Sequence, residues 1–329
     1  MIKDEQEFVR WLRRTVPSAQ GRLRLGIGDD AAVMEVTPGR HLILTTDLTI
    51  ENVHFTQETH SPRAVGHRAL ARSLSDIAAM GGEPRVALVS IALSRRTTRK
   101  WVKGFYSGLL PLAKRHGVAI IGGDTSVADG PILIDIVAGG EIPRGKELRR
   151  SGARPGDWIF VSGPLGLSRA GLALLKSGRG KTRRAAEAIT VHTHLHPEPR
   201  CGLGRLLSKA GIASATIDIS DGLSTDLKRL CEASGTGARI WESSIPVAPL
   251  TRASGYSSSE ILEFALHGGE DYELLFTVPR TKVARLPRRF GGVELRRIGE
   301  ITKGHEICLV RRTGNEEILA PAGWDHFRK

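Results

Sequence analysis

The chain has 329 residues, and its 48 Lys and Arg against 35 Asp and Glu give a formal net charge of +13. At roughly 100–200 residues per domain, this length predicts two domains. A hydrophobic content of 40% with 25% charged residues is typical of globular proteins and excludes a wholly disordered chain. No run approaches about 18 uninterrupted apolar residues, so no membrane-spanning helix is expected.

The N-terminus and the cysteines favour a cytoplasmic location. Acidic residues stand where a signal peptide would have its apolar run. Phe8, Val9, Leu12 and Val16 instead fit one face of a helix. The three cysteines are odd in number and far apart, which is typical of reduced intracellular thiols.

The positive charge is scattered along the chain. Basic runs occur at 95–100, 149–154, 179–184 and 286–290, without interleaved aromatic residues. This pattern favours a solvated basic surface over a nucleic-acid-binding protein. A field that attracts anionic small molecules, such as phosphorylated substrates, stays open as an alternative.

In the first half, apolar and polar residues predict alternating strands and helices. We expect a strand over 41–50 that ends in a polar, acidic turn, and a helix over 64–80 with Asp76 roughly 120° from its apolar stripe. The remaining elements are expected at 86–93 (strand), 99–116 (helix), 118–124 (strand entering a glycine turn) and 131–142 (strand).

A segment rich in Arg, Gly and Pro, 143–157, predicts the boundary between domains 1–147 and 148–329. Residues 178–200 are basic and are expected to be irregular. The other predicted elements are strands at 158–163, 215–220, 272–278, 293–301 and 306–310, and helices at 164–177, 200–210 and 222–234. This alternation predicts an α/β or α+β architecture in both halves.

Three motif matches are poor candidates for function. Residues 26–31 fit a dinucleotide-binding pattern but place two aspartates where a pyrophosphate would approach. Residues 180–182 resemble the end of a Walker A loop, but its earlier glycine is replaced by Leu175. His192, His194 and His196 alternate, so they could bind zinc on an extended segment, although a polar loop is favoured.

Acidic residues recur beside apolar strands, in segments rich in glycine or hydroxyl groups. They are Asp29 and Asp30, Asp47 after Thr45 and Thr46, Asp76, Asp124, Asp218 with Asp221, and Glu270 with Asp271. A single acid of this kind is usually a cap or turn residue, but a buried carboxylate is costly unless it is paired or binds a metal. Mg²⁺ prefers such oxygen ligands and bridges them to phosphates, and neighbouring glycines let backbone N–H groups approach phosphate. The set therefore indicates a phosphate-handling site with several Mg²⁺ ions and no P-loop.

Eight segments in order resemble the thiamine-monophosphate kinase family of the aminoimidazole-ribonucleotide synthetase superfamily. They are GIGDDAAV (26–33), TTDLTIENVHF (45–55), LSDIAAMGGEPRVALVSIAL (74–93), IIGGDTS (120–126), RSGARPGD (150–157), DISDGL (218–223), GGEDYELLFT (268–277) and GWDHF (323–327). The resemblance implies a two-domain PurM-like fold of the α/β (α+β) class. Its N-terminal mixed-sheet domain pairs in a homodimer and binds ATP and Mg²⁺, and its C-terminal domain is α/β.

The implied activity is transfer of the γ-phosphoryl group of ATP to thiamine monophosphate, which gives thiamine diphosphate in the last step of its biosynthesis. The implied metal ligands are Asp30, Thr45, Thr46, Asp47, Asp76, Asp124, Asp218 and Asp221, with Asp47, Asp76 and Asp124 central to catalysis. The implied ATP contacts are Tyr106, Gly123, Asp124, Arg150 and Ser220, and the implied substrate contacts are His54, Glu270 and Trp324.

Trp324 suits this role because an indole face attracts a cation such as thiazolium. Structural roles remain alternatives for Trp324, His54 and Tyr106. The chain departs from many relatives at Ser73 and at His67-Arg68, close to Asp76. A sister enzyme of the superfamily, a non-catalytic ATP-binding relative and a nucleic-acid-binding protein are the competing interpretations.

The acceptor phosphate is already ionised at neutral pH, so the implied reaction needs no dedicated general base. We therefore expect direct in-line transfer without a phospho-enzyme.

Overall fold

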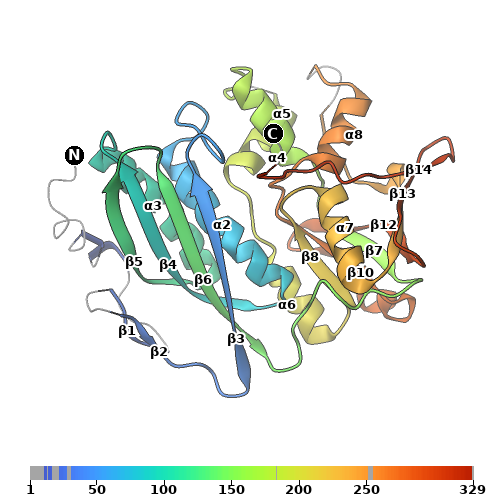
Figure 1. The fold of residues 1–329 in the computed structure, drawn as a ribbon, viewed down its shortest axis with the longest axis horizontal. Coiled ribbons are helices and arrows are strands. Elements are labelled where there is room, and N and C mark those ends of the chain that lie inside the picture. The colour runs from blue at the N-terminus through green and yellow to red at the C-terminus, as the bar shows by residue number, and fades with distance from the viewer. Residues whose placement is uncertain are drawn as a thin grey trace. The chain divides into compact units, whose positions relative to one another are not determined.

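The computed structural model describes residues 11–12, 14–16, 22–27, 31–182, 184–250 and 255–327 (Figure 1). The chain divides into two compact units. Unit 1 comprises Met1–Ile77 and Gly82–Gly145, and unit 2 comprises Ala78–Gly81 and Lys146–Lys329. The domain boundary expected between residues 147 and 148 stays a prediction.

Unit 1 is built on a mixed four-stranded sheet in the order β3-β6-β4-β5. The strands are β3 (Arg40–Ile50), β4 (Glu83–Ser94), β5 (Ala119–Ala128) and β6 (Leu133–Pro143), and only β4 and β5 pair in parallel. Helices α2 (Pro62–Ala79) and α3 (Arg99–His116) cover one face (Figure 1). That face is apolar because alternate residues of the strands, such as Ile134 and Ile136, are fully buried.

Helices α2 and α3 cross at two reciprocal glycines. A Cβ on Gly66 would lie 1.9 Å from the carbonyl oxygen of Phe105, and one on Gly108 would lie 1.9 Å from that of Arg63. Only glycine permits this approach of two helix backbones. The crossing fixes the position of α2, which carries Asp76, on the helix-covered face of the sheet.

The other face of this sheet presents large apolar side chains to solvent. Leu44 is 64% exposed and Leu48 is 53% exposed, and Leu42 and Leu133 are exposed as well. A short two-stranded sheet, β1 (Leu23–Leu25) with β2 (Val33–Met34), contributes to a small cluster with Val86 and Ile121. Exposed apolar patches of this kind mark contact surfaces.

Unit 2 contains an eight-stranded sheet whose main path is β14-β13-β9-β12-β7-β10-β8, with β11 paired to β12. Its strands are β7 (Trp158–Ser162), β8 (Ala215–Ile219), β9 (Gly237–Trp241), β10 (Glu273–Val278), β11 (Arg289–Phe290), β12 (Val293–Thr302), β13 (Ile307–Val310) and β14 (Glu316–Ile318). Its helices are α4 (Leu167–Lys176), α5 (Ala185–Leu195), α6 (Cys201–Ala210), α7 (Leu223–Ser234) and α8 (Ser258–His267), with 3₁₀ turns η1 (Glu242–Ser244) and η3 (Arg280–Arg285). The main core packs α7 and α8 residues, including Leu227 and Ala265, against strand residues such as Ile217 and Leu275.

The expected fold class is confirmed: both units are mixtures of α and β elements, and the sheet of unit 1 is mixed. The irregular segment predicted over 178–200 is wrong, because α5 occupies Ala185–Leu195. Helix α5 packs on α4, where Thr190 and His194 lie against Gly171, a tertiary contact that the basic flanks obscure. Helix α8 was not predicted, although Ser257 and Glu260 form a capping box at its start.

One strand also extends further than expected. The strand predicted over 41–50 with an acidic turn at its end is confirmed, because β3 spans Arg40–Ile50 and Glu51 leads into a turn at 52–54. The glycine turn predicted at 122–124 is wrong, because β5 pairs with β4 up to Ala128. Ladder pairing therefore overrides the local turn signals. Of the predicted N-terminal helix face, Phe8 and Val9 lie outside the described residues. None of the described helices has the length and hydropathy required to cross a bilayer.

Replacing Gly108 with Ala tests the helix crossing. Because the added methyl would overlap the Arg63 carbonyl oxygen, we expect a loss of about 1–3 kcal/mol, typical of overpacking. Thermal unfolding measures the effect. Ser107→Ala, a change at the neighbouring exposed position of the same helix, should leave the midpoint close to that of the parent chain. Equal midpoints for both variants would contradict the crossing.

Candidate functional site

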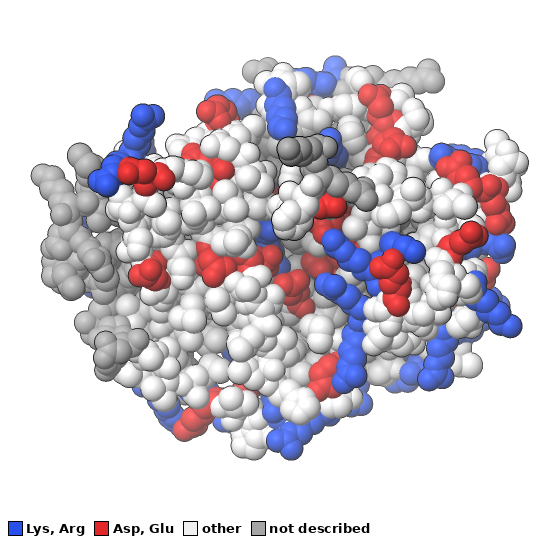
Figure 2. Space-filling view, in the orientation of Figure 1, with Lys and Arg blue, Asp and Glu red and all other residues white. Residues whose placement is uncertain are grey.

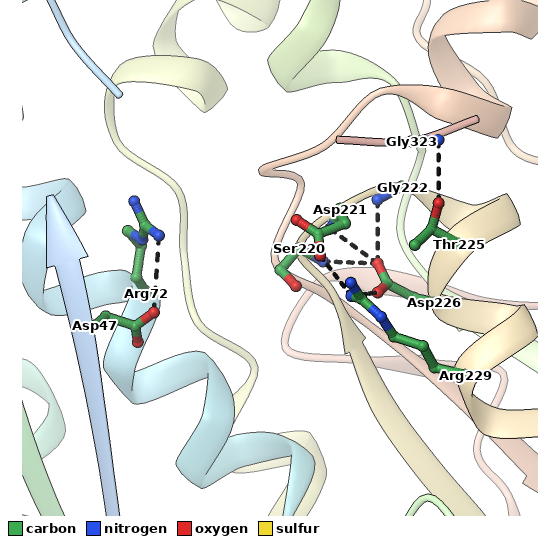
Figure 3. Close-up of polar contacts among 9 residues, drawn as sticks. All are labelled: Asp47, Arg72, Ser220, Asp221, Gly222, Thr225, Asp226, Arg229 and Gly323. Carbon is green, nitrogen blue, oxygen red and sulfur yellow. Dashed lines mark hydrogen bonds and ion pairs between the residues drawn. The ribbon is translucent and has the colours of Figure 1, made fainter. Parts of the chain in front are cut away.

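In unit 1, strand β3 and helix α2 bring two of the predicted carboxylates together. Asp47 lies within β3, and Asp76 lies on α2, where its Oδ2 accepts a hydrogen bond from Thr45 Oγ1. Arg72, one turn before Asp76 on α2, places Nη2 3.7 Å from Asp47 Oδ1 (Figure 3). Thr45 and Asp47 are two residues apart on one strand and so share a face. The predicted association of Thr45, Asp47 and Asp76 is therefore present within unit 1.

Burial and neighbouring negative charge disfavour the ionised form of Asp47. Burial, and after it the charge of Asp76, raise the pKa of Asp47 to about 6 against the opposing effect of Arg72. Its Oδ2 atom is buried and accepts no hydrogen bond from the part of the chain that the structure describes. An ionised oxygen in this position favours a bound cation. The described residues contain no group of three or more His, Cys, Asp or Glu arranged to hold a metal ion.

Thr46 points away from this pair. Its Oγ1 donates a 2.6 Å hydrogen bond to Asp135 Oδ1 on β6, because neighbouring residues in a strand face opposite sides of the sheet. Thr46 and Asp47 therefore do not share a single site within unit 1. Asp135 is not among the predicted residues, although an aspartate between Ile134 and Ile136 in an apolar strand is an available signal.

Gly123 and Asp124 lie inside β5 at an unusually close contact. Gly123 has φ +146°, and a Cβ there would lie 1.9 Å from the carbonyl oxygen of Val89, so only glycine fits. Asp124 is exposed and pairs with Ser90, which pairs in turn with Asp135. Asp124 and Asp135 therefore lie in one row across the sheet.

His54 and Tyr106, which are predicted to contact thiamine monophosphate and ATP, have contrasting environments in unit 1. The backbone N–H of Ile50 donates to His54 Nδ1 at 3.0 Å, which leaves the Nε2 atom to carry the proton of the neutral ring. Tyr106 is only 2% exposed, and its ring makes an edge contact with Trp11 at 5.5 Å between centroids. Burial raises the pKa of Tyr106, so its hydroxyl stays protonated. This burial supports the structural alternative for Tyr106.

In unit 2, the loop after β8 is organised by Asp226, which the sequence analysis did not single out. Asp226 Oδ2 accepts hydrogen bonds from the backbone N–H groups of Ser220, Asp221 and Gly222 at 3.1, 2.9 and 3.1 Å (Figure 3). The expectation that the glycines here free backbone N–H groups for phosphate is wrong for this loop, because a carboxylate of the chain already takes them. The contact of Ser220 with a nucleotide would have to come from its side chain.

Arg229 joins two carboxylates of this loop. Its Nη1 lies 2.5 Å from Asp221 Oδ2 and 2.8 Å from Asp226 Oδ1 (Figure 3). Burial raises the pKa of Asp226 to about 6, and Arg229 works against that rise. A hollow of about 430 Å³ lies beside these residues, and its lining includes Asp221, Lys228, Arg229 and Trp324. Trp324 is 49% exposed, which fits a contact surface better than a core anchor.

The segment 268–272 lies next to the same loop. The backbone N–H of Glu270 donates to Ser220 O at 2.7 Å, and that of Tyr272 donates to Ile219 O at 2.9 Å. Glu270 and Tyr272 both have positive φ, +67° and +52°, which is strained for residues with side chains. Between them, Asp271 accepts hydrogen bonds from Gly166 N and Ser168 N at the start of α4, at 2.6 and 3.0 Å. Asp271 thus holds a strained segment that carries Glu270.

Asp218 is buried in β8, and Arg150 is exposed. Asp30 lies outside the described residues. The structure therefore brings Thr45, Asp47 and Asp76 together within unit 1. Within unit 2, it brings together Ser220, Asp221, Glu270 and Trp324.

The three alternating histidines lie on α5 and its C-terminal cap and not in the favoured polar loop, because this segment packs on α4. His194 is fully buried and bonds Ser168 Oγ at 2.8 Å, while the rings of His192 and His196 stack at 4.9 Å. Helical spacing thus separates His194 from the other two, and an extended three-histidine zinc site is wrong.

Charge on the surface is dispersed. On the face drawn in Figure 2, Lys and Arg and also Asp and Glu lie in small groups separated by uncharged residues. This distribution fits the solvated basic surface that the sequence predicts.

Comparisons with known proteins identify relatives over nearly the whole chain. A family model for the AIR synthase related protein, N-terminal domain, matches residues 28–142, and the corresponding C-terminal domain model matches residues 154–311. The chain is 37% identical over 316 residues to thiamine-monophosphate kinase of Escherichia coli strain K12, covering 95% of this chain and 94% of that protein. It is 36% identical to the Bacillus subtilis enzyme of the same name, covering 92% and 94%.

Solved structures give the same result. Thiamine-monophosphate kinase from Stenotrophomonas maltophilia K279a superposes with a TM-score of 0.80 at 33% identity, over 92% of this chain and 94% of that chain. A structure described as AaThiL complexed with AMPPCP and TMP superposes with a TM-score of 0.77 at 33% identity, over 98% and 97%. The E. coli hydrogenase maturation protein HypE, at 21% identity and a TM-score of 0.75, shares the fold.

Asp271→Asn tests how the strained segment is held. Burial raises the pKa of Asp271 from 3.8 to about 7, against the opposing effect of the Ser168 and Gly166 N–H groups. The folded state therefore binds a proton that the unfolded state releases between these values, so the contribution of Asp271 to stability falls as pH rises from about 4 to 7.

Because Asn cannot ionise, the melting temperature of the parent chain minus that of the Asn variant should decrease as the pH rises from about 4 to 7. Melting curves at several pH values measure it, with the exposed Asp129→Asn as control. A difference that stays constant with pH would contradict the buried, proton-binding carboxyl.

Proposed function

This chain belongs to the thiamine-monophosphate kinase family, and from that premise we propose that it transfers the γ-phosphoryl group of ATP to thiamine monophosphate, giving thiamine diphosphate and ADP. The resemblance inferred from the eight motifs is thereby confirmed. The observation that carries the proposal is the match over 98% of the chain to AaThiL complexed with AMPPCP, an ATP analogue, and TMP. The product completes thiamine diphosphate biosynthesis.

The carboxylates of unit 1 fit a hard divalent cation. Thr45, Asp47 and Asp76 offer hydroxyl and carboxylate oxygens, and the buried Asp47 Oδ2 accepts no hydrogen bond from any described residue. We propose these residues, with Asp30, Thr46, Asp124, Asp218 and Asp221, as ligands of several Mg²⁺ ions. Bound Mg²⁺ would neutralise the phosphates of both substrates and stabilise charge on the transferred group.

The residues around the two substrates need only bind and orient them. Thiamine monophosphate carries an ionised phosphate, so its oxygen is nucleophilic without proton removal, and the transfer proceeds in line without a general base. We assign nucleotide contacts to Gly123, Asp124, Arg150 and Ser220, and thiamine monophosphate contacts to His54, Glu270 and Trp324. The buried Tyr106 keeps a structural role. The half-exposed indole of Trp324 would face the thiazolium cation.

The exposed apolar face of the unit 1 sheet supports a homodimer. Leu42, Leu44 and Leu48 line one strand at 44, 64 and 53% exposure, an arrangement that costs free energy in water unless it is covered. We propose that a second copy of the chain covers it. The domain boundary at 147/148 and the cytoplasmic location are part of the same proposal.

Product identification tests the activity directly. The protein should convert thiamine monophosphate and ATP, with Mg²⁺, into thiamine diphosphate and ADP in equal amounts. Chromatography of both products separates this reaction from ATP hydrolysis and from the reactions of sister enzymes. Absence of thiamine diphosphate from a folded, metal-supplied sample would refute the proposal.

Asp47→Asn tests the metal-ligand assignment. The substitution removes one charged ligand oxygen while keeping the side chain's shape, so turnover should fall by orders of magnitude while circular dichroism and the folded state are retained. Asp129→Asn, a change at an exposed aspartate paired with Arg95, should retain parental turnover. Near-parental activity of Asp47→Asn would show that the assignment is wrong.

Leu44→Glu tests the homodimer. A charge in the centre of the apolar face cannot be buried without a partner, so light scattering should show a monomer where the parent chain is a dimer. Ile318→Glu, at an equally exposed position in unit 2, should leave the dimer intact. A monomeric parent chain would overturn the dimer.

A further inference from the structure

The loop formed by Ser220, Asp221 and Gly222 is the point at which three functional segments of unit 2 meet. Its carbonyl groups hold the other two segments: Ser220 O accepts from Glu270 N at 2.7 Å, and Asp221 O accepts from Trp324 N at 2.9 Å. The positions of Glu270 and Trp324 therefore depend on the position of this loop.

The amide groups of the same loop point the other way, onto one oxygen. Asp226 Oδ2 accepts all three N–H groups at 2.9–3.1 Å, and Asp226 is 0% exposed. Its second oxygen accepts from Arg229 at 2.8 Å, and the same Arg229 atom contacts the Asp221 side chain. One carboxylate thus fixes both the backbone of the loop and, through Arg229, the side chain of Asp221.

Neighbouring segments restrict the backbone conformation of the 220–222 loop. Gly222 has φ +115°, and a Cβ there would lie 2.9 Å from the backbone of His267. A second tie to the C-terminal segment comes from Thr225, whose Oγ1 accepts from Gly323 N at 3.0 Å. Asn at position 226 has one acceptor oxygen for two sets of donors, the three loop N–H groups and Arg229, so one set loses its acceptor and either the loop or the Asp221 side chain must move.

We propose that Asp226 is a positioning residue that sets the metal ligand Asp221 and the substrate-binding residues Glu270 and Trp324 at once, through the 220–222 loop. Asp226 contacts neither substrate; it acts through the backbone that carries these groups. This inference rests on the proposed function, because it assigns a shared support to residues of that site.

The test compares Asp226→Asn with the parent chain in steady-state kinetics. If one loop carries both sets of groups, the KM for thiamine monophosphate and the Mg²⁺ concentration for half-maximal activity should rise together, each at least tenfold. A merely structural role would lower the fraction of folded enzyme, and therefore kcat, without moving either value.

Asp157→Asn is the matched control. Asp157 is also a buried aspartate of unit 2, and its Oδ2 accepts from Arg154 N at 3.1 Å and Ser214 Oγ at 2.6 Å. Its loss should lower the melting temperature while leaving the KM and the Mg²⁺ midpoint within twofold of the parent values. Asp226→Glu, which keeps the carboxylate but lengthens it, serves as the second variant and should show the same paired rise.

Unchanged KM and Mg²⁺ midpoint in a folded Asp226 variant would overturn the proposal, and so would failure of both Asp226 variants to fold, since Asp226 would then be structural. Mn²⁺ binding, followed by electron paramagnetic resonance without substrates, keeps the inference separate from the proposed activity. Weaker Mn²⁺ binding by Asp226→Asn than by Asp157→Asn supports positioning even if the parent chain fails to phosphorylate thiamine monophosphate. Equal binding by the two variants would count against it.

Discussion

Each unit must keep carboxyl groups buried inside a folded chain, and this requirement organises the candidate site. A buried carboxylate needs hydrogen-bond donors or a cation to offset the loss of water. Asp226 receives three backbone N–H groups and Arg229, and Asp271 receives two N–H groups at the start of α4. Asp47 has the distant Arg72 and a buried oxygen that no described donor reaches. The first two are satisfied by the protein, whereas the third is suited to a bound cation.

This contrast separates acids that the protein itself supplies with donors from acids that we propose to bind a cation. The acids supplied with donors shape the backbone that carries Ser220, Asp221 and Glu270, and they do so at the cost of raised pKa values. Strain at Glu270 and Tyr272 remains because that surrounding network holds it in place. In the proposed kinase, such preorganisation aligns two phosphorylated substrates without requiring a general base.

Much of the architecture could be predicted from the sequence because burial imposes simple periodicities. The alternation in β3 and the apolar stripe of α2 are visible without a structure, and the helix over 99–116 has the predicted bounds. Local signals failed where tertiary contacts decided the outcome. The glycines at 122–123 suggested a turn, yet pairing with β4 carries the strand past them; α5 forms in a basic segment because α4 covers it.

The sequence by itself determined the family, because eight ordered motifs are present, and it predicted a site rich in the oxygen side chains that metal and phosphate binding require. Only the tertiary structure decided which of those oxygens are available. Thr46 and Asp47 are neighbours in the chain but face opposite sides of a sheet, and the amides of Ser220, Asp221 and Gly222 are already bound to Asp226. Hydrogen-bond partners and sheet faces depend on residues distant in sequence, so no local pattern could reveal them.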